Sequence, residues 1–391
     1  MRVAVKLLGN GLWLGGEIYL RNLFRSIKYT KGSTIDVCLF TDNQESGLDK
    51  YTSSTNVTNV IHYQTPQRWT ARWLVNGVFK RLLLIDGLAG KVLKDNGVRV
   101  FFGPSLLLKY PGVATLSWLP DFQHVHLPDM FAESEIASRN EQFLKTAAVT
   151  NRVVVLSEAV KNDFQSFAPQ YINKVRVIPP ISYIPESVYA RDPKSVISIY
   201  DLPERFAYLP NQFWKHKNHE AVFRALRILK DRGLRVPLVC TGYAEDYRHR
   251  GYFAELWLKA SRWGVRDCIF YLGVVPREHV LLLMRQSACV VNPSMFEGWG
   301  FSVDEAKSLG KRVVVSDIPA HREQDPAAAL YFNPMDSEEL ANQLSRAWTG
   351  YDPRAEINLQ YEAKEIQRDR LAAFGEQFIS VCREVSGEST L

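Results

Sequence analysis

Short runs of β-branched and aromatic residues alternate along the chain with longer stretches whose apolar residues recur every three or four positions. The short runs are typical of strands, and the longer stretches are typical of amphipathic helices. This alternation favours an α/β protein in which helices pack on parallel sheets. In the first half we expect a helix over residues 17–27 and strands over residues 2–8, 35–40, 99–102, 114–118, 152–156 and 175–178.

The same pattern restarts after a proline-bearing stretch between Pro179 and Pro203, which we interpret as a linker because prolines interrupt regular structure. Beyond it we expect strands over residues 206–209, 236–241, 268–271, 288–292 and 312–316, and helices over 218–232, 252–263, 277–286, 303–309 and 363–385. The predicted organisation is an N-terminal Rossmann-like domain (1–183), a linker (184–202), a C-terminal Rossmann-like domain (203–360) and a final helical segment (361–391).

The composition fits this picture and excludes several classes of protein. A chain of 391 residues with 46% apolar residues can build two or three domains with sizeable cores. Its five cysteines form no Cys-x-x-Cys pair, which fits a reducing compartment and argues against a disulfide framework or a zinc site. No stretch of about 18 apolar residues occurs and the first residues read as a strand, so we expect neither a membrane span nor a signal peptide.

One basic and aromatic segment stands out against the modest net charge of +6. Residues 65–94 carry six basic residues and one acid, Asp86, with aromatic side chains between them. Such a stretch can lie in a bilayer interface, which predicts peripheral membrane contact. The alternative is an amphipathic helix whose apolar face packs on the sheet while its basic residues face water. No nucleic-acid-binding motif accompanies the charge, so we expect no nucleic acid partner.

The most informative segment spans residues 293–310 and contains two glutamates, Glu297 and Glu305, eight positions apart. A buried strand is expected before it, at 288–292, and a short helix after Gly300. A strand that leads through a glycine-bracketed turn into a helix presents free backbone N–H groups and the positive end of the helix dipole, which together favour an anion. The two carboxylates are placed to hold different hydroxyls of one elongated ligand.

This segment reads Pro-Ser-x-x-Glu-Gly-x-Gly-Phe-x-x-x-Glu-Ala and resembles the paired-glutamate motif of retaining GT-B glycosyltransferases, especially glycosyltransferase family 4 (glycosyl transferases group 1). The resemblance implies two doubly wound domains that face each other across a cleft, with the final helix packed back on the first domain. It implies that Glu297 contacts the donor sugar and Glu305 the nucleotide ribose. The donor phosphates would rest on the backbone N–H groups of the turn, which belong to Gly298, Gly300, Phe301 and Ser302.

The start of the second domain resembles the family segment Gly-Arg-x-x-x-x-Lys-Asn, in which the arginine and the lysine neutralise the leaving diphosphate. Lys217 matches the lysine and is the expected catalytic cation. Asn218 follows it and is expected to cap the next helix. Gln212 stands at the arginine position and brings no positive charge, so we expect Lys215 or another basic residue to compensate.

Two further turns resemble donor-side turns of the family. The loop that ends in Gly15-Gly16 follows the first strand, where a backbone without side chains can approach a phosphate or sugar closely. A plain tight turn would explain Gly16 as well. The turn after the strand at 268–271 contains Gly273 and Val274, and in the family this backbone meets the nucleobase. Backbone recognition leaves the identity of the base open.

In the first domain, the loop after the strand at 114–118 resembles the family loop that carries an acidic residue or a histidine close to the transferred sugar. Pro120 takes the usual histidine position and Asp121 follows it. We expect Asp121 first and His124 second to orient or deprotonate the acceptor hydroxyl. The alternative is that the local backbone satisfies these polar side chains. His124 and His126 lack a third ligand nearby, so we expect no metal.

Together these features predict a metal-independent, retaining hexosyltransferase in the cytoplasm or at the inner face of the membrane. Its donor would be a nucleotide diphosphate-sugar, with no further cofactor. Its acceptor would be a hydroxyl of a glycan or lipid-linked glycan, in surface polysaccharide or O-antigen assembly. Two other classes fit parts of the sequence. One is a non-catalytic GT-B protein that binds a nucleotide sugar or glycan as a partner, and the other is a basic membrane-surface adaptor.

Overall fold

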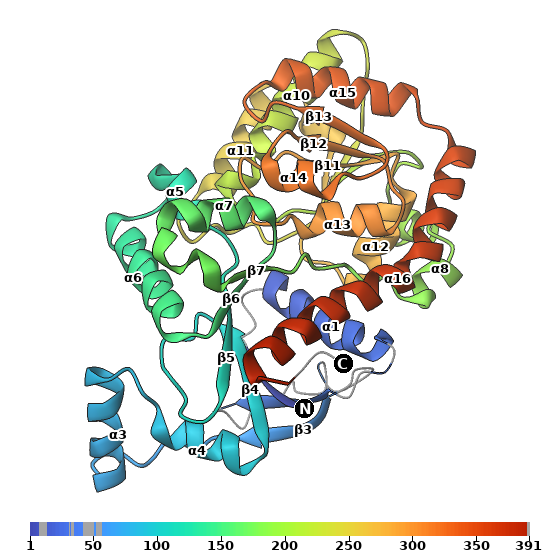
Figure 1. Cartoon of the computed structure of the whole chain (residues 1–391). Coiled ribbons are helices and arrows are strands. Elements are labelled where there is room, and N and C mark those ends of the chain that lie inside the picture. Colours follow the sequence, from blue (N-terminus) through green and yellow to red (C-terminus); the bar gives the residue numbers. More distant parts are fainter. Residues whose placement is uncertain (8–13, 31, 33–34, 42–50, 52–56, 389–391) are drawn as a thin grey trace. The chain divides into compact units, whose positions relative to one another are not determined.

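Two parallel β-sheets flanked by helices organise the chain (Figure 1). The computed structural model describes residues 1–7, 14–30, 32, 35–41, 51 and 57–388. Contacts divide the chain into two units. The first comprises Met1–Phe122, Glu133–Ile181 and Arg368–Leu391, and the second comprises Gln123–Ala132 and Ser182–Gln367. The predicted α/β class with two Rossmann-like domains is confirmed.

Within the described residues, the first unit has a seven-stranded sheet in the order β3-β2-β1-β4-β5-β6-β7. All neighbouring strands run parallel. Its central strands are β-branched and aromatic runs buried on both faces, as expected where helices cover both sides of a parallel sheet. The strands are β1 (Arg2–Lys6), β2 (Asp36–Thr41), β3 (Val57–His62), β4 (Val98–Pro104), β5 (Ala114–Trp118), β6 (Arg152–Val155) and β7 (Val175–Val177).

Helices of the first unit follow their strands along the chain. Ser157 begins α7 as expected, because its hydroxyl accepts a hydrogen bond from the Val160 N–H. Tyr19 of α1 stacks on Trp118 at the end of β5, with ring centroids 4.2 Å apart. The helices are α1 (Leu14–Tyr29), α3 (Ala71–Leu82), α4 (Gly87–Asp95), α6 (Glu133–Val149), α7 (Glu158–Phe167) and the 3-10 helix η2 (Pro169–Lys174).

In the described part of the second unit, a six-stranded parallel sheet has the order β10-β9-β8-β11-β12-β13. The strands are β8 (Ala207–Leu209), β9 (Leu238–Cys240), β10 (Ile269–Tyr271), β11 (Cys289–Asn292), β12 (Val313–Ser316) and β13 (Ala329–Phe332). The helices are α5 (Gln123–His126), α8 (Glu186–Ala190), α9 (Ser195–Tyr200), α10 (His219–Asp231), α11 (Tyr252–Arg262), α12 (Arg277–Gln286), α13 (Phe301–Ser308), α14 (Pro319–Gln324) and α15 (Ser337–Thr349), with 3-10 helices η1 (Pro128–Met130), η3 (Lys215–Lys217) and η4 (Arg266–Cys268).

Each sheet has a point where the order of its strands reverses. In the second sheet the chain moves from β8 outward through β9 to β10, and from β11 outward in the opposite direction through β12 to β13. β8 and β11 are therefore neighbours at the switch point, where ligands bind at the carboxyl ends of the strands in open α/β sheets. The corresponding neighbours in the first sheet are β1 and β4. The loop after β1 includes residues 8–13, which lie outside the described residues.

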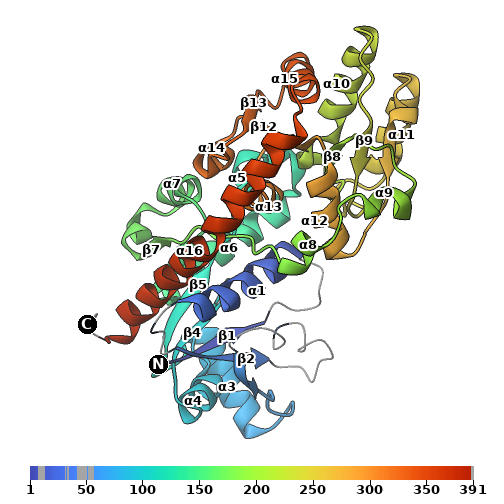
Figure 2. The same ribbon diagram turned by 90° about the vertical axis from the view of Figure 1, so that its right-hand side faces the viewer.

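The last helix, α16 (Pro353–Ser386), contributes to both units. Its second half packs in the first unit, where both views show it beside α1 (Figures 1 and 2). There Phe374 meets Tyr19 edge to face at 5.9 Å, and Phe378 meets Phe102 at 5.1 Å. Glu384, near the end of α16, forms ion pairs with arginines on β6 and β7.

Two glycines let backbones approach closely around α16. A Cβ on Gly310, which has φ +66°, would collide with the Leu359 carbonyl in the second unit. A Cβ on Gly375 would lie 2.5 Å from the Ser26 carbonyl oxygen in the first unit. No larger residue fits either position without a shift of backbone.

Several element boundaries differ from the sequence prediction. α1 begins at Leu14, so Gly15 and Gly16 lie in its first turn and not in the preceding loop. α16 begins at Pro353, because proline fits the first turn of a helix. β3, β13 and α15 were not predicted. The segment 184–202 forms α8 and α9, and four apolar side chains in it join a buried core of the second unit: Ile184, Val188, Val196 and Leu202.

Candidate functional site

The candidate site is built on the loops that follow β8 and β11, the two strands at the switch point of the second sheet. The loop after β8 contains η3 and ends at Lys217, just before α10. The loop after β11 carries Glu297 and ends at Gly300, where α13 begins. Because the strands are neighbours, their loops meet at one edge of the sheet, and the Met295 N–H donates to the His216 carbonyl at 2.8 Å.

An ion pair joins the two loops. Lys217 Nζ lies 2.5 Å from Glu297 Oε1, and the two side chains are 19% and 11% exposed. The Ser294 hydroxyl lies 2.6 Å from the same carboxylate oxygen. Two of the predicted catalytic residues thus come together from positions 80 residues apart. This pairing holds a carboxylate and an ammonium group at the carboxyl end of the sheet.

The environment of Glu297 favours its charged form. Burial alone would raise its pKa, but the Lys217 ammonium and the hydrogen bonds from Lys217 and Ser294 outweigh this effect. The pKa of Glu297 therefore lies below its ordinary value of 4.5. At neutral pH the group is an ionised carboxylate, which accepts hydrogen bonds from sugar hydroxyls and does not act as an acid.

His321 lies fully buried beside this turn. Its Nδ1 lies 2.9 Å from the Ser316 carbonyl oxygen, so Nδ1 carries the proton and donates it. Burial lowers the pKa of His321, which keeps the ring neutral at pH 7. Its Nε2 is buried and has no hydrogen-bond partner among the described residues. A Cβ on Gly300 would lie 3.1 Å from this nitrogen, so Gly300 leaves room for the ring.

The N-terminus of α13 follows directly. Gly300 takes φ +92°, a backbone conformation that glycine adopts without strain. The first N–H groups of α13, at Phe301 and Ser302, have no acceptor within the helix. Ser302 Oγ is fixed between the side chains of Asn292 (2.9 Å) and Asn211 (3.1 Å), which ties the turn to both strands of the switch point. These hydrogen bonds hold the start of α13 in place.

Glu305 lies one turn further along α13 and is buried, with 5% of its side chain exposed. It pairs with Arg277, the first residue of α12, at 2.7 Å. Arg277 follows the turn predicted to meet the nucleobase, so an ion pair joins the proposed ribose carboxylate to the residue directly after that turn. The sequence reasoning did not single out Arg277, although a basic residue directly after that turn was a usable signal.

Three further residues were predicted on the loop before α10. Asn218 begins this helix as expected, but with φ +55° and without a side-chain cap. Its amide instead donates to the carbonyls of Pro293 (3.1 Å) and Pro334 (2.8 Å), so it braces the Glu297 loop. Lys215 is exposed, and Gln212 is half-buried.

The turn predicted to face the nucleobase contacts the loop after β9. Gly273 has φ +68°, and its carbonyl accepts from the Gly242 N–H at 2.8 Å. Val274 is 56% exposed. A Cβ on Gly242 would lie 2.6 Å from the Asn211 carbonyl oxygen, so Gly242 allows the loops after β8 and β9 to touch. Gly242 was missed because a lone glycine after a strand carries no specific signal.

The residues predicted in the first half of the chain fall in different units. Asp121 is half-buried and follows β5 in the first unit. His124 and His126 lie on α5, which belongs to the second unit. His124 is buried against Phe131. His126 is exposed and stacks on Phe296, with ring centroids 4.7 Å apart.

The stacked contact places His126 next to the residue that precedes Glu297. Of the two histidines on α5, His126 is therefore the one that contacts the glutamate turn, whereas His124 was the one expected from the sequence. Arg248 also contacts α5 and the residues that follow it. Its guanidinium donates to the side-chain oxygen of Gln123 at 3.2 Å and lies over the Phe131 ring, 4.5 Å from the ring centroid. Arg248 is nearly buried and also lies 3.3 Å from His216 Nδ1.

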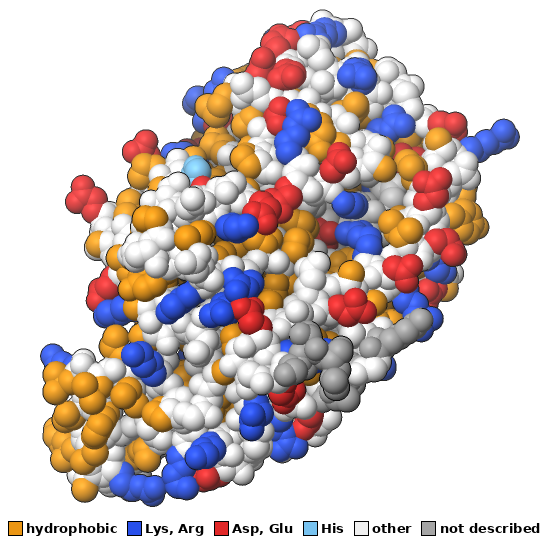
Figure 3. All heavy atoms as spheres, viewed as in Figure 1, with side chains coloured by type: hydrophobic (Ala, Val, Ile, Leu, Met, Phe, Trp, Pro, Cys, Tyr) orange, Lys and Arg blue, Asp and Glu red, His pale blue; other side chains and the backbone are white. Residues whose placement is uncertain are grey.

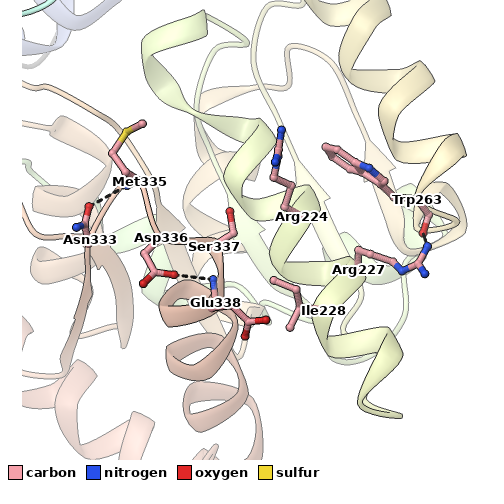
Figure 4. A pocket seen from close by; sticks show the side chains of 9 residues that line it. All are labelled: Arg224, Arg227, Ile228, Trp263, Asn333, Met335, Asp336, Ser337 and Glu338. Atoms are coloured by element: carbon pink, nitrogen blue, oxygen red, sulfur yellow. Dashed lines mark hydrogen bonds between the residues drawn. The ribbon is translucent and has the colours of Figure 1, made fainter.

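A surface pocket of the second unit lies elsewhere, between α10 and the start of α15 (Figure 4). Its two arginines are already paired within α10, Arg224 with Glu220 and Arg227 with Asp231. Asp336 caps α15 by accepting from the Glu338 N–H at 2.9 Å. The pocket shares no lining residue with the glutamate cluster, so its position does not change the candidate site. The lining residues are Arg224, Arg227, Ile228, Trp263, Asn333, Met335, Asp336, Ser337 and Glu338.

The described residues show neither a metal cluster nor a membrane-spanning helix. No group of three or more His, Cys, Asp or Glu side chains in these ranges is arranged to hold a metal ion. Within the same ranges no helix combines the length and apolar character needed to cross a bilayer. All five cysteines are buried.

Residues 197–364 match the family model described as glycosyl transferases group 1. O-antigen chain mannosyltransferase B of Escherichia coli is 23% identical over 258 residues, which span 64% of this chain and 66% of that protein. A solved glycosyltransferase from Rickettsia africae ESF-5 matches with a TM-score of 0.69 at 16% identity, over 99% of both chains. HepE from Anabaena, solved in complex with UDP-glucose, matches with a TM-score of 0.69 at 17% identity, over 98% of this chain and 100% of that chain.

These matches agree with each other and with the motif. The solved structures share the fold along nearly the whole chain, and the family model covers residues 197–364, which contain Lys217, Glu297 and Glu305. The predicted GT-B glycosyltransferase is confirmed, while its assignment to glycosyltransferase family 4 stays a prediction. The comparisons therefore support a GT-B glycosyltransferase, and residues 197–364 match the group 1 family model.

Proposed function

We propose that this protein is a retaining hexosyltransferase that uses a nucleoside diphosphate-sugar donor and a glycan or lipid-linked glycan acceptor. The observation that supports this most directly is the Lys217–Glu297 pair at the switch point of the second sheet, beside the N-terminus of α13. The O-antigen mannosyltransferase relative supports a role in surface polysaccharide or O-antigen assembly. The UDP-glucose complex of HepE supports a nucleotide sugar as the donor.

The leaving diphosphate gains negative charge as the bond between the sugar and the phosphate oxygen breaks. In our proposal Lys217 and the N–H groups of Gly300 and Phe301 stabilise that charge. Because the helix N-terminus and the ammonium are fixed before the reaction, they favour the transition state over the ground state. Gln212 would contribute a hydrogen bond but no charge.

Glu297 and Ser294 would hold the hydroxyls of the transferred sugar, and Glu305 would hold the ribose. Both carboxylates have basic partners in the structure, Lys217 and Arg277. Donor binding would therefore replace part of each ion pair by contacts to hydroxyls and phosphates. The paired state keeps the buried carboxylates satisfied until the donor arrives.

In a retaining transfer the acceptor oxygen attacks on the face from which the diphosphate departs. The acceptor proton can then pass to the departing phosphate oxygen, so no strong protein base is required. Asp121, His124 or the neighbouring His126 would orient the acceptor hydroxyl. In this proposal the transfer needs no metal and no further cofactor. It takes place in the cytoplasm, at the inner face of the membrane when the acceptor is lipid-linked.

A panel of UDP-, GDP-, ADP- and dTDP-sugars tests the proposal. We expect slow release of free nucleotide from one donor, which persists in EDTA and is lost in Glu297→Gln. Proton NMR of a product formed with an added acceptor should show the anomeric configuration of the donor. Turnover with inverted configuration would reject the retaining mechanism.

The same panel separates the proposal from a non-catalytic binding role. Gln212, which brings no positive charge to the usual arginine position, is the feature that favours this alternative. Stabilisation of the folded chain by one nucleotide sugar, measured as a rise in Tm, reports binding without turnover. A donor that raises Tm but releases no nucleotide, with or without glycan acceptors, would favour the binding protein over the enzyme.

A further inference from the structure

Helix α3 of the first unit turns its polar side inward and its apolar side outward. Asn76 is the one buried residue that the helix contains. Its amide donates to Asp86 Oδ1 at 3.3 Å, and Lys80, one turn later, pairs with Asp86 Oδ2 at 2.6 Å. Asp86 is buried and also caps α4 by accepting from the Ala89 N–H. Polar contacts, not an apolar core, therefore hold the inner side of α3.

The outer side forms a continuous apolar surface, which we call the α3 patch. Figure 3 shows it as a cluster of hydrophobic side chains at the lower left, where α3 lies in Figure 1. With about 100° of rotation per residue, the apolar positions of α3 fall in one arc of the helix, except for the half-buried Trp73 on the opposite side. The side chains of the patch are between 45% and 80% exposed: Trp69, Leu74, Val75, Val78, Phe79, Leu82 and Leu83.

This arrangement contradicts the alternative in which the apolar face packs on the sheet. Soluble proteins rarely expose so many large apolar side chains on consecutive turns without a partner. Trp69 and Trp73 lie together at the start of the helix, with ring centroids 5.6 Å apart. Tryptophan is favoured where an apolar phase meets water.

Basic residues border the α3 patch. By the same helical rotation, Arg72 and Arg81 fall at the two edges of the apolar arc, and both are exposed. α3 contains no acidic residue. Arg68 before the helix and Lys94 on α4 are exposed as well. Long basic side chains at the edges of an apolar face can reach lipid phosphates while the apolar side chains enter the interface.

We propose that the α3 patch docks the first unit on an anionic lipid bilayer. The apolar side chains supply the burial, and the flanking arginines supply the preference for acidic headgroups. A second copy of this chain fits less well. In a symmetric dimer the patch would meet itself, and the arginines at its edges would face arginines with no acidic residue of α3 to pair with them.

Flotation of the full-length chain with lipid vesicles tests this proposal. We expect binding to vesicles of phosphatidylcholine with phosphatidylglycerol, and weaker binding to phosphatidylcholine alone. The triple variant Leu74→Ser/Val78→Ser/Leu82→Ser should lower the partition coefficient about tenfold or more. Its matched control, Ile199→Ser/Leu258→Ser/Met335→Ser, replaces similarly exposed apolar residues of the second unit and should bind like the wild type.

A charge-reversal pair tests the lipid preference separately. Arg72→Glu/Arg81→Glu should lose about tenfold in binding to the acidic vesicles, whereas Arg262→Glu/Arg354→Glu, with the same net charge, should not. Circular dichroism and urea unfolding confirm that each variant is folded. The proposal is overturned if the wild type ignores acidic vesicles or if the apolar triple variant binds as well as the wild type. It is also overturned if the wild type is a dimer and the apolar triple variant is a monomer.

These experiments need no sugar nucleotide. If the chain did not bind vesicles, the proposed glycosyl transfer would be unaffected. Glu297→Gln should lose transfer but still bind vesicles like the wild type.

Discussion

In the second unit, the switch point carries buried, paired charges, whereas the most prominent feature of the first unit is an exposed apolar helix that no described element covers. The two sheets share a parallel, doubly wound topology. What differs is the chemistry that the loops add. Lys217 and Glu297 form an ion pair in the second unit, whereas α3 of the first unit leaves its apolar side exposed. One architecture can thus present paired charges or an exposed apolar surface, depending on the segments that connect its strands.

The largest effect we expect comes from the paired charges. Glu297→Gln or Lys217→Met should lower kcat/KM for sugar transfer by about a thousandfold, because each removes a contact that strengthens as the diphosphate leaves. Steady-state kinetics with the identified donor would measure this. Asp267→Asn is the matched control, since it breaks an exposed ion pair with Arg235 just before β10, at the opposite end of the strands.

The double variant Lys217→Met/Glu297→Gln distinguishes a catalytic role from a purely structural one. Each single variant leaves a nearly buried group without its partner and should lower the free energy of unfolding. The double variant removes both charges and should recover part of that stability, while its turnover stays low. If recovery of stability brought recovery of turnover, the pair would have only a structural role.

The next largest effect concerns the two glycines at the close backbone contacts of α16, one in each unit. Gly310→Ala and Gly375→Ala should each lower the free energy of unfolding by about 2–4 kcal/mol, because the new Cβ meets backbone atoms that cannot move freely. Urea unfolding measures this. Gly87→Ala is the control, since a Cβ there meets nothing within 4 Å, and it should be neutral or stabilising. Equal effects in all three variants would contradict the close-packing account.

A smaller effect is expected at the aromatic contact beside the glutamate turn. His126→Ala should lower kcat/KM about tenfold, because the ring no longer braces Phe296 next to Glu297. Val125→Ala, at its exposed neighbour, should not change the rate. If kcat/KM fell in His124→Ala but not in His126→Ala, His124 would be the functional histidine, as expected from the sequence.

The smallest effect concerns pH. The pKa of Glu297 is lowered in the folded chain, so its ionisation stabilises the fold above the ordinary pKa of 4.5, and this contribution is lost as pH falls through the lower, folded-state pKa. The unfolding free energy of the wild type should therefore approach that of Glu297→Gln on acidification from pH 5. Urea titrations of both proteins at several pH values measure the gap. If the difference in unfolding free energy between the two proteins grew on acidification, the pKa of Glu297 would be raised in the folded chain, contrary to our prediction.

Much of the fold and part of the site could be read from the sequence, for identifiable reasons. The central strands are continuous apolar runs, and the Glu297 turn combines glycines, a proline and a helix start within a few residues. Signals of this kind are local. β3 was missed because much of it is exposed at the sheet edge, and its residues lack a buried pattern. The start of α1 was misplaced because glycines read as a loop, although a first helical turn tolerates them.

Contacts between distant segments could not be predicted. Nothing in the sequence pairs Arg277 with Glu305, or places His126 on Phe296 from positions far apart in the chain. Asn218 was expected to cap a helix, yet its amide ties two loops together, because tertiary acceptors compete with local ones. For the same reason, the sequence did not decide whether the apolar face of α3 packs inward or is exposed. Helical periodicity gives two faces but does not say which one turns inward.

The central claim is that the charges at the second switch point hold a nucleotide sugar. Isothermal titration of UDP and GDP into the wild type, Lys217→Met and Asp267→Asn tests it most directly. We expect one nucleotide to bind the wild type and Asp267→Asn equally, and Lys217→Met about tenfold or more weakly. Equal affinity of Lys217→Met and the wild type, or no binding of any nucleoside diphosphate, would contradict the claim.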